Sequence, residues 1–271
     1  GIVCSVPGAN IEREGRPVQA SELFHQPNTI LLDGGMGTML QAAGMKLGTR
    51  PEDLNIENPE LIQSIHAKYA AAGSRVVNAN TFGASPHKLA DSKYTLEEVI
   101  TAGIANCKQA VAPYGALVTL DVGPLGELLE PSGTLAFEDA VAEYGRIVRA
   151  GVAAGADILY FETFTDLYEM KAALLAAKEN STLPIMASMS FEANGRTFTG
   201  CTVESFAATA RGLGANAVGI NCSLGPKEIF PMAKRLAEAV PGDFPVFVKP
   251  NAGLPRADGS GYDITPQLFA L

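Results

Sequence analysis

The sequence of 271 residues has no long apolar run and no cluster of basic residues. A transmembrane helix needs about 20 consecutive apolar residues, and a secretory signal needs a charged start followed by an apolar core. Neither pattern occurs in the chain. Its net charge of -9 also disfavours binding to the phosphate backbone of nucleic acids. These absences predict a globular cytoplasmic protein without a membrane or nucleic-acid partner.

Cysteine and histidine are both scarce. The four cysteines, at positions 4, 107, 201 and 222, are far apart and form no CxxC pair. In a chain without an export signal this pattern predicts free thiols, not disulfides. The three histidines stand at positions 25, 66 and 87. None has a spacing that would make it the base of a cysteine nucleophile at position 222.

The sequence does contain ample apolar material in a repeating order. Hydrophobic residues make up 47% and charged residues 18%, enough for a large core. Short apolar runs ending in small or polar residues alternate with amphipathic stretches. The runs are Ile30–Asp33, Val76–Asn80, Ala116–Asp121, Ile158–Glu162, Pro184–Ser190, Ala217–Cys222 and Pro245–Asn251. Near-continuous apolar character is typical of strands buried on both faces of a parallel sheet.

The amphipathic stretches carry apolar residues at spacings of three and four, which predicts helices. They are Pro59–Ala72, Leu96–Val111, Phe137–Ala154, Asp166–Lys178, Val203–Leu213 and Lys227–Ala239. Regular alternation of strand and helix over this length favours a single α/β barrel, which typically needs about 250 residues. A doubly wound sheet is the structural alternative.

Seven runs fall one short of the eight strands of a (β/α)8 TIM barrel. We therefore expect a barrel truncated before its eighth strand, with the tail after Asn251 forming a loop and the start of a helix. Residues 1–27 are expected to form an N-terminal extension with a short helix near Ala20–His25. Residues 28–271 are expected to form the barrel.

Barrel enzymes place their chemistry at the carboxyl ends of the strands, so the residues that finish the runs are the site candidates. Asp33 ends the first run, and Gly34 and Gly35 follow it. Adjacent glycines let backbone amides approach a carboxylate, but their spacing is not the GxGxxG of a nicotinamide site. Glu162 ends the fourth run. Asp33 and Glu162 could act as general acid and base or hold a substrate ammonium, and both options stay open.

Cys222 ends the sixth run and is the strongest single candidate for a functional residue. A thiol at the mouth of a barrel can act as a nucleophile or as a metal ligand. A lone cysteine is also a common small buried apolar residue. Position and residue type alone favour that second interpretation.

Five short motifs along the chain together resemble the homocysteine S-methyltransferase family. They read DGGMGT from Asp33, NANTF from Asn78, ET from Glu162, GINC from Gly219 and PNAGLP from Pro250. The resemblance extends from about residue 28 onwards. The last motif is most similar to the homocysteine-binding module of cobalamin-dependent methionine synthase.

The resemblance implies zinc-dependent methyl transfer to the thiol of homocysteine, giving methionine. Zinc held by cysteine thiolates would bind the substrate sulfur as thiolate, so no side chain is needed as acid or base. By resemblance Cys222 is one zinc ligand and Asn251 an oxygen donor, and two further cysteines are expected beyond Leu271. Methylcobalamin would be presented by another module, and folate- and cobalamin-binding modules of the parent chain or a partner subunit are the expected partners.

The resemblance also assigns the substrate contacts. Asp33 and Glu162 would bind the ammonium group of homocysteine, and the backbone amides of Gly34 and Gly35 would bind its carboxylate. These assignments agree with the charges of the groups involved.

The chain departs from the family at the metal site, because the family's Gly-Gly-Cys-Cys-Gly motif is absent. We therefore expect the chain alone to bind zinc weakly and to be inactive. Cys201 is the least implausible substitute ligand. Two alternatives remain: a stand-alone methyltransferase that uses S-methylmethionine or betaine, and a non-catalytic barrel fragment.

Overall fold

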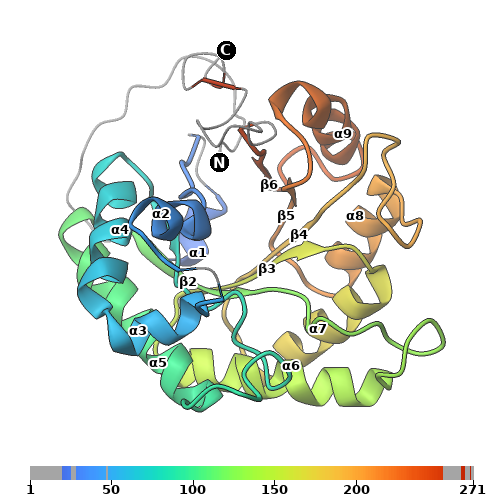
Figure 1. The fold of residues 1–271 in the computed structure, drawn as a ribbon. Helices are drawn as coiled ribbons and strands as arrows, with labels where there is room; N and C mark the ends of the chain where they lie inside the picture. Colours follow the sequence, from blue (N-terminus) through green and yellow to red (C-terminus); the bar gives the residue numbers. More distant parts are fainter. Residues whose placement is uncertain (1–19, 26–28, 47, 253–263, 266–268, 270–271) are drawn as a thin grey trace.

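The computed structural model describes residues 20–25, 29–46, 48–252, 264–265 and 269. At its centre is a sheet of six parallel strands whose spatial order follows the chain. The strands are β1 Val76–Asn78, β2 Leu117–Val122, β3 Ile158–Phe164, β4 Ile185–Met189, β5 Ala217–Asn221 and β6 Val246–Lys249. The sheet curls, and helices surround its outer side (Figure 1). This is the strand and helix arrangement of a partial (β/α)8 barrel, which confirms the predicted fold class.

The six predicted helices are present, and their ends agree with the predicted ends to within two residues. They are α4 Pro59–Ala71, α5 Leu96–Val111, α6 Phe137–Ala153, α7 Leu167–Asn180, α8 Val203–Gly212 and α9 Pro226–Glu238. Shorter helical segments are α1 Ala20–Leu23, α2 Met36–Ala42, α3 Leu54–Glu57, η1 Pro51–Asp53 and η2 Ala112–Tyr114. In the described ranges, no helix has the length and apolar character needed to cross a membrane.

Polar caps fix where several of these helices begin. Thr95 and Glu98 form a capping box at the start of α5, in which each side chain bonds the other residue's backbone amide. Asp166 accepts a hydrogen bond from the amide of Tyr168 at the start of α7, and Thr202 caps α8 in the same way. Each cap binds an amide that the helix itself leaves unpaired, so each helix starts directly after the loop that follows a strand.

The first predicted strand, Ile30–Asp33, lies in the expected place but forms only a bridge. Leu32 pairs with Val76 in parallel, and the amide of Asp33 donates to the carbonyl of Val76 at 3.2 Å. The amide of Asn78, at the end of the three-residue β1, donates to the Asp33 side chain at 2.8 Å and so is not available to extend the backbone ladder. The segment still takes the first barrel position, beside β1.

The predicted extension and tail fall largely outside the described residues. Within the extension, α1 confirms the short helix expected near Ala20–His25. Most of the predicted tail, from residue 253 onwards, lies outside the described ranges.

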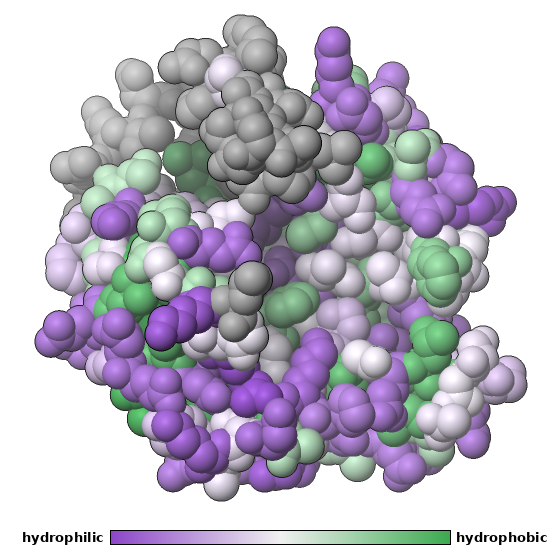
Figure 2. Space-filling model, viewed as in Figure 1, coloured by the Kyte–Doolittle hydropathy of each residue, from purple (hydrophilic) through white to green (hydrophobic). Residues whose placement is uncertain are grey.

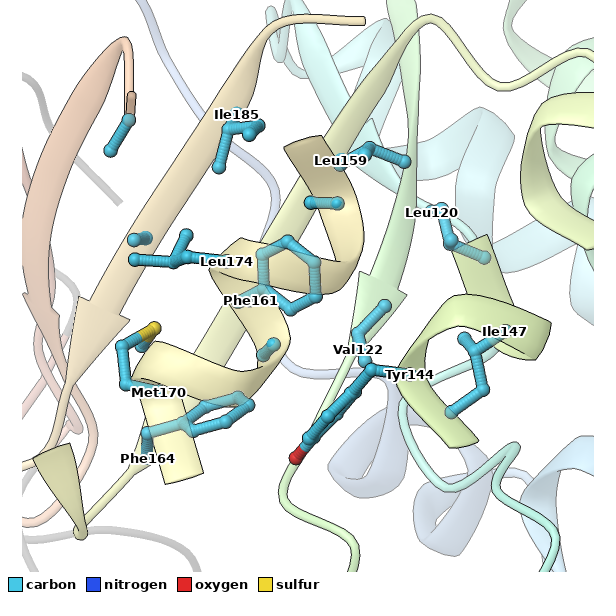
Figure 3. Packing of buried hydrophobic residues seen from close by; sticks show 14 of the residues in the cluster. Leu120, Val122, Tyr144, Ile147, Leu159, Phe161, Phe164, Met170, Leu174 and Ile185 are labelled. Atoms are coloured by element: carbon cyan, nitrogen blue, oxygen red, sulfur yellow. The ribbon is translucent and has the colours of Figure 1, made fainter. Parts of the chain in front are cut away.

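Two apolar layers hold the barrel together. The larger lies between the sheet and the outer helices, where Tyr144, Phe161 and Phe164 meet edge-on or tilted at ring-centroid distances of 5.9 to 6.3 Å (Figure 3). The smaller fills the concave side of the sheet, where the rings of Tyr160 and Phe247 pack edge to face at 5.5 Å. Strands buried on both faces explain why the sequence shows apolar runs and no alternation.

Candidate functional site

The carboxyl ends of distant strands bring three charged side chains together. The Lys249 Nζ lies 3.1 Å from Asp33 Oδ1 and 3.9 Å from Glu162 Oε2. All three side chains are largely buried, with exposed fractions of 13% for Lys249, 5% for Asp33 and 15% for Glu162. Asp33 and Glu162 were predicted from the sequence, and the structure places a carboxylate oxygen of each within 4 Å of one lysine nitrogen.

The charges of this cluster perturb one another strongly. Burial alone would lower the pKa of Lys249, but the carboxylates of Asp33, Glu162 and Asp121 outweigh it and raise that pKa. Burial raises the pKa of Glu162, and the positive charge of Lys249 opposes the rise. Burial and the nearby Glu162 carboxylate also place the pKa of Asp121 well above its usual range. Carboxylates outnumber the cation here, so the pocket favours positive charge.

Asn221, the last residue of β5, connects this cluster to the thiol of Cys222. Its Oδ1 accepts hydrogen bonds from the Thr163 amide at 3.0 Å and from Ser188 Oγ at 2.8 Å. Its Nδ2 lies 2.7 Å from Thr163 Oγ1, 3.3 Å from Cys222 Sγ and 3.4 Å from Glu162 Oε2. The side chain is 1% exposed, so these bonds replace water completely. Asn221 therefore fixes the relative positions of the ends of β3, β4 and β5.

Strained backbone surrounds the thiol. Thr163, Cys222 and Ser223 have φ angles of 66°, 60° and 62°, in the left-handed region that residues with a Cβ avoid. The pairing of β3 with β4 shifts register between Phe161 and Phe164, next to the Thr163 outlier. Such strain persists only where the surrounding structure enforces it, and it is concentrated at functional sites.

Cys222 is half-buried, so the structure does not support its interpretation as a fully buried apolar residue. Burial and the Glu162 carboxylate raise the pKa of its thiol, while hydrogen bonds from Thr163 and Asn221 lower it. The Cys222 amide donates to the Lys249 carbonyl at 3.1 Å, and the Asn251 amide donates to the Leu224 carbonyl at 2.9 Å. The loops that carry the two predicted metal ligands are therefore hydrogen-bonded to each other.

The other described cysteines lie apart from this loop pair. Cys107 is buried in α5 with its Sγ 3.8 Å from the Val77 carbonyl, and Cys201 Sγ contacts the carbonyl of Thr202 at 3.2 Å. Cys4 lies outside the described residues. In the part of the chain that the structure describes, no three His, Cys, Asp or Glu side chains are grouped to hold a metal. Zinc normally takes three or four protein ligands, so Cys222 and Asn251 fit as members of a zinc site but do not complete one.

The two glycines after Asp33 have a structural role as well as the predicted one. A Cβ on Gly34 would lie within 3.0 Å of the Tyr69 ring, whose hydroxyl donates to the Gly35 carbonyl at 3.0 Å. The close approach of Tyr69 therefore explains the glycine at position 34. Binding of a carboxylate by the amides of Gly34 and Gly35 remains a prediction.

Sequence reasoning missed Lys249, Asn221 and Asp121. Each stands in an apolar run that was predicted correctly as a strand, and a polar residue within such a run was the available signal. In the space-filling view the surface is hollowed near the middle of the ring of helices, and both hydrophilic and hydrophobic residues line the hollow (Figure 2).

Comparison with known proteins places this chain in a family. Residues 30–271 match the family model described as homocysteine S-methyltransferase. The chain is 30% identical over 258 residues to the methionine synthase of Mycobacterium tuberculosis (strain ATCC 25618 / H37Rv), an alignment that covers 88% of the chain but only 21% of that protein. The chain thus spans about a fifth of the length of this relative.

Solved structures agree with the family match. The metallated form of the homocysteine methyltransferase MmuM from Escherichia coli superposes with a TM-score of 0.76 at 25% identity, covering 92% of this chain and 90% of that one. Its apo form gives a TM-score of 0.67 at 26% identity, covering 89% and 86%. The chain belongs to the homocysteine S-methyltransferase family.

Proposed function

We propose that this chain transfers a methyl group to the thiol of homocysteine in a zinc-dependent reaction that yields methionine, as the homocysteine-binding module of a methionine synthase. The observation that carries the proposal is the buried pair of carboxylates, Asp33 and Glu162, of which Glu162 shares the Asn221 amide with the thiol of Cys222. An acidic pocket beside a metal-binding thiol suits a substrate with an ammonium group at one end and a sulfur at the other. Residues 28–271 would form the barrel unit and residues 1–27 an extension, in a cytoplasmic protein.

The roles of the chain's own residues follow from charge and position. Asp33 and Glu162 would hold the substrate ammonium, and the amides of Gly34 and Gly35 would hold its carboxylate. Asn221 fixes the positions of Glu162 and Cys222 relative to each other, because its Nδ2 is hydrogen-bonded to both side chains. No described side chain needs to act as a general base.

Zinc, when bound, would lower the pKa of the substrate thiol and so supply a nucleophilic sulfur at neutral pH. Cys222 and Asn251 are the described residues suited to hold it. The two further cysteine ligands that the resemblance implies are not among the residues of this chain, because the Gly-Gly-Cys-Cys-Gly motif is absent from it. The chain alone is therefore expected to bind zinc weakly and to show little activity.

The methyl donor distinguishes two versions of the proposal. The match to a fifth of a methionine synthase favours methylcobalamin presented by another module, with folate- and cobalamin-binding modules as partners. The superposition with E. coli MmuM, 90% of which is covered, favours a self-contained enzyme that uses a small donor such as S-methylmethionine or betaine.

Calorimetry with L-homocysteine, in the presence and absence of zinc, tests the binding step. We expect binding in both conditions, and tighter binding when zinc is added in large excess to fill the weak metal site. The same titration of the Cys222→Ala variant should lose the dependence on zinc. Methionine formation with methylcobalamin, S-methylmethionine or betaine as donor then identifies the donor. A chain that binds no homocysteine with or without zinc would support the non-catalytic alternative.

A further inference from the structure

Lys249 fills the pocket that Asp33 and Glu162 form. Its Nζ is 3.1 Å from Asp33 Oδ1, and the other oxygen of Asp33 accepts a hydrogen bond from the Asn78 amide at 2.8 Å. Both oxygens of Asp33 therefore already have partners inside the chain. A second cation entering this pocket would find its strongest carboxylate partner occupied.

The terminal group of lysine and the ammonium group of an amino acid are the same functional group. Each is a primary ammonium with three N–H donors, and each is stabilised by the same carboxylate oxygens. We propose that Lys249 is an internal ligand of the ammonium pocket: it binds Asp33 and Glu162 while the amino acid is absent, and it must leave for the substrate ammonium to enter. This inference rests on the proposed function, because it takes the substrate to be an amino acid.

The surroundings explain why Lys249 takes this position in the ligand-free chain. Without a cation, Asp33 and Glu162 would lie close together in a buried site near Asp121, whose Oδ1 has no hydrogen-bond partner within the described part of the chain. Buried carboxylates without a counter-charge are strongly unfavourable. The lysine ammonium also lies 5.4 Å from the centre of the Tyr160 ring, a cation–π distance.

The same surroundings allow the lysine to leave. Lys249 is the last residue of β6, so its backbone stays in place while its four side-chain torsions turn. Its contact with Glu162 is long, at 3.9 Å. An arriving ammonium would keep both carboxylates paired, so exchange does not leave either of them uncompensated.

Competition of this kind lowers the apparent affinity for the amino acid, because the binding-competent state is only a fraction of the ligand-free population. The competition by Lys249 affects only the ammonium group of the ligand, not its thiol. Removing Lys249 should therefore improve binding of homocysteine and leave a thiol without the ammonium group unaffected.

Calorimetry with zinc on the wild-type chain, Lys249→Met and Lys108→Met tests this selectivity. The ligands are L-homocysteine and 4-mercaptobutyrate, which differ only in the ammonium group. We expect Lys249→Met to raise the preference for homocysteine over 4-mercaptobutyrate by about tenfold or more. Lys108 is the matched control, because it also forms a 3.1 Å ion pair, with Asp157, and Asp157 binds the amide of Val118 near the opposite end of the strands.

An unchanged preference in Lys249→Met overturns the inference. If both affinities are also unchanged, Lys249 does not affect binding at all. If both fall equally, Lys249 is a partner of the substrate carboxylate and not a competitor of its ammonium group. If the wild-type chain binds neither thiol, the proposed function fails, and with it the claim of competition.

Chemical rescue tests the pocket without homocysteine. In Lys249→Ala, butylammonium should raise the Tm, while 1-butanol of the same length should not, because the vacated site requires the charge. Lys108→Ala should show no such difference. Equal effects of butylammonium and butanol on Lys249→Ala would show that the pocket does not select a primary ammonium.

Discussion

At the scale of single residues, the most unusual group outside the site is His66 in α4. It is completely buried, and neither ring nitrogen has a hydrogen-bond partner among the residues that the structure describes. Burial lowers its pKa to about 4, although the nearby Asp33 opposes the shift. The folded protein therefore keeps this ring neutral at pH values where an unfolded chain, with a histidine pKa of about 6.5, protonates it.

This difference predicts a dependence of stability on pH. Because the unfolded state binds the proton first, the free energy of unfolding should fall as the pH drops from about 6.5 towards 4. Between pH 7.5 and pH 5 the contribution of His66 is about 2 kcal/mol. Urea denaturation at both pH values should therefore show a smaller loss for His66→Leu than for the wild-type chain.

The control for this prediction is Ile65→Val in the same helix, because it changes a buried side chain without removing a titratable group. Its loss of stability on acidification should match that of the wild-type chain. If His66→Leu and the wild-type chain lose the same free energy of unfolding on acidification, the neutral, buried His66 is not the source of the pH dependence.

At the scale of elements, β5 and β6 approach each other closely through a glycine. A Cβ on Gly219 would lie 2.4 Å from the Phe247 ring and 2.6 Å from the Phe247 carbonyl oxygen. The carbonyl belongs to the backbone of the neighbouring strand, so it cannot turn aside as a side chain can. Only glycine allows the interior ring of Phe247 to pack over β5.

Gly219→Ala should therefore lower the free energy of unfolding by about 3 kcal/mol, since overpacking of a tight core shifts the backbone. Gly37→Ala in α2 is the matched control, because a Cβ there meets nothing within 4 Å. Gly37 is the second residue of α2, so the higher helix propensity of alanine should stabilise the protein by up to about 1 kcal/mol. Thermal denaturation should show a lower Tm than the wild type for Gly219→Ala and a higher Tm for Gly37→Ala. Equal Tm values for the two variants would refute the packing argument.

At the scale of the whole molecule, the outer helices are joined by ion pairs at two separate places. Arg146 of α6 binds Glu97 of α5 through two bonds of 2.7 and 2.8 Å, and Arg235 of α9 binds Glu204 of α8 through two bonds of 2.8 Å. All four side chains are more than a third exposed. Water and salt therefore screen both pairs.

Arg146→Ala and Arg235→Ala should each cost less than about 1 kcal/mol of stability. The two sites share no partner, so the double variant should lose the sum of the single losses to within about 0.5 kcal/mol, if the barrel unfolds as one unit. Urea denaturation of the four proteins measures this. A clear departure from the sum would show that the two ion pairs are energetically coupled, and two separate transitions would show that the barrel does not unfold as one unit.

The sequence predicted the order of strands and helices because buried parallel strands appear as apolar runs and the helices between them have their own spacing. It also placed Asp33 and Glu162 at strand ends, where the structure brings them together. It could not place Lys249, because its position depends on the pairing of β6 with β5, in which Asn221 lies opposite Lys249. Pairing register and the direction of a side chain at a strand end are set by tertiary packing.

The left-handed backbone at Cys222 and Ser223 lowers the stability of the protein at the position that carries the thiol of the proposed site. Left-handed geometry costs a residue with a Cβ roughly 1–2 kcal/mol, and glycine avoids most of that cost. Selection or engineering for thermostability alone would therefore tend to replace Cys222 by glycine and remove the thiol. A stabilised barrel obtained in this way would keep its fold while losing the sulfur at the centre of its proposed chemistry.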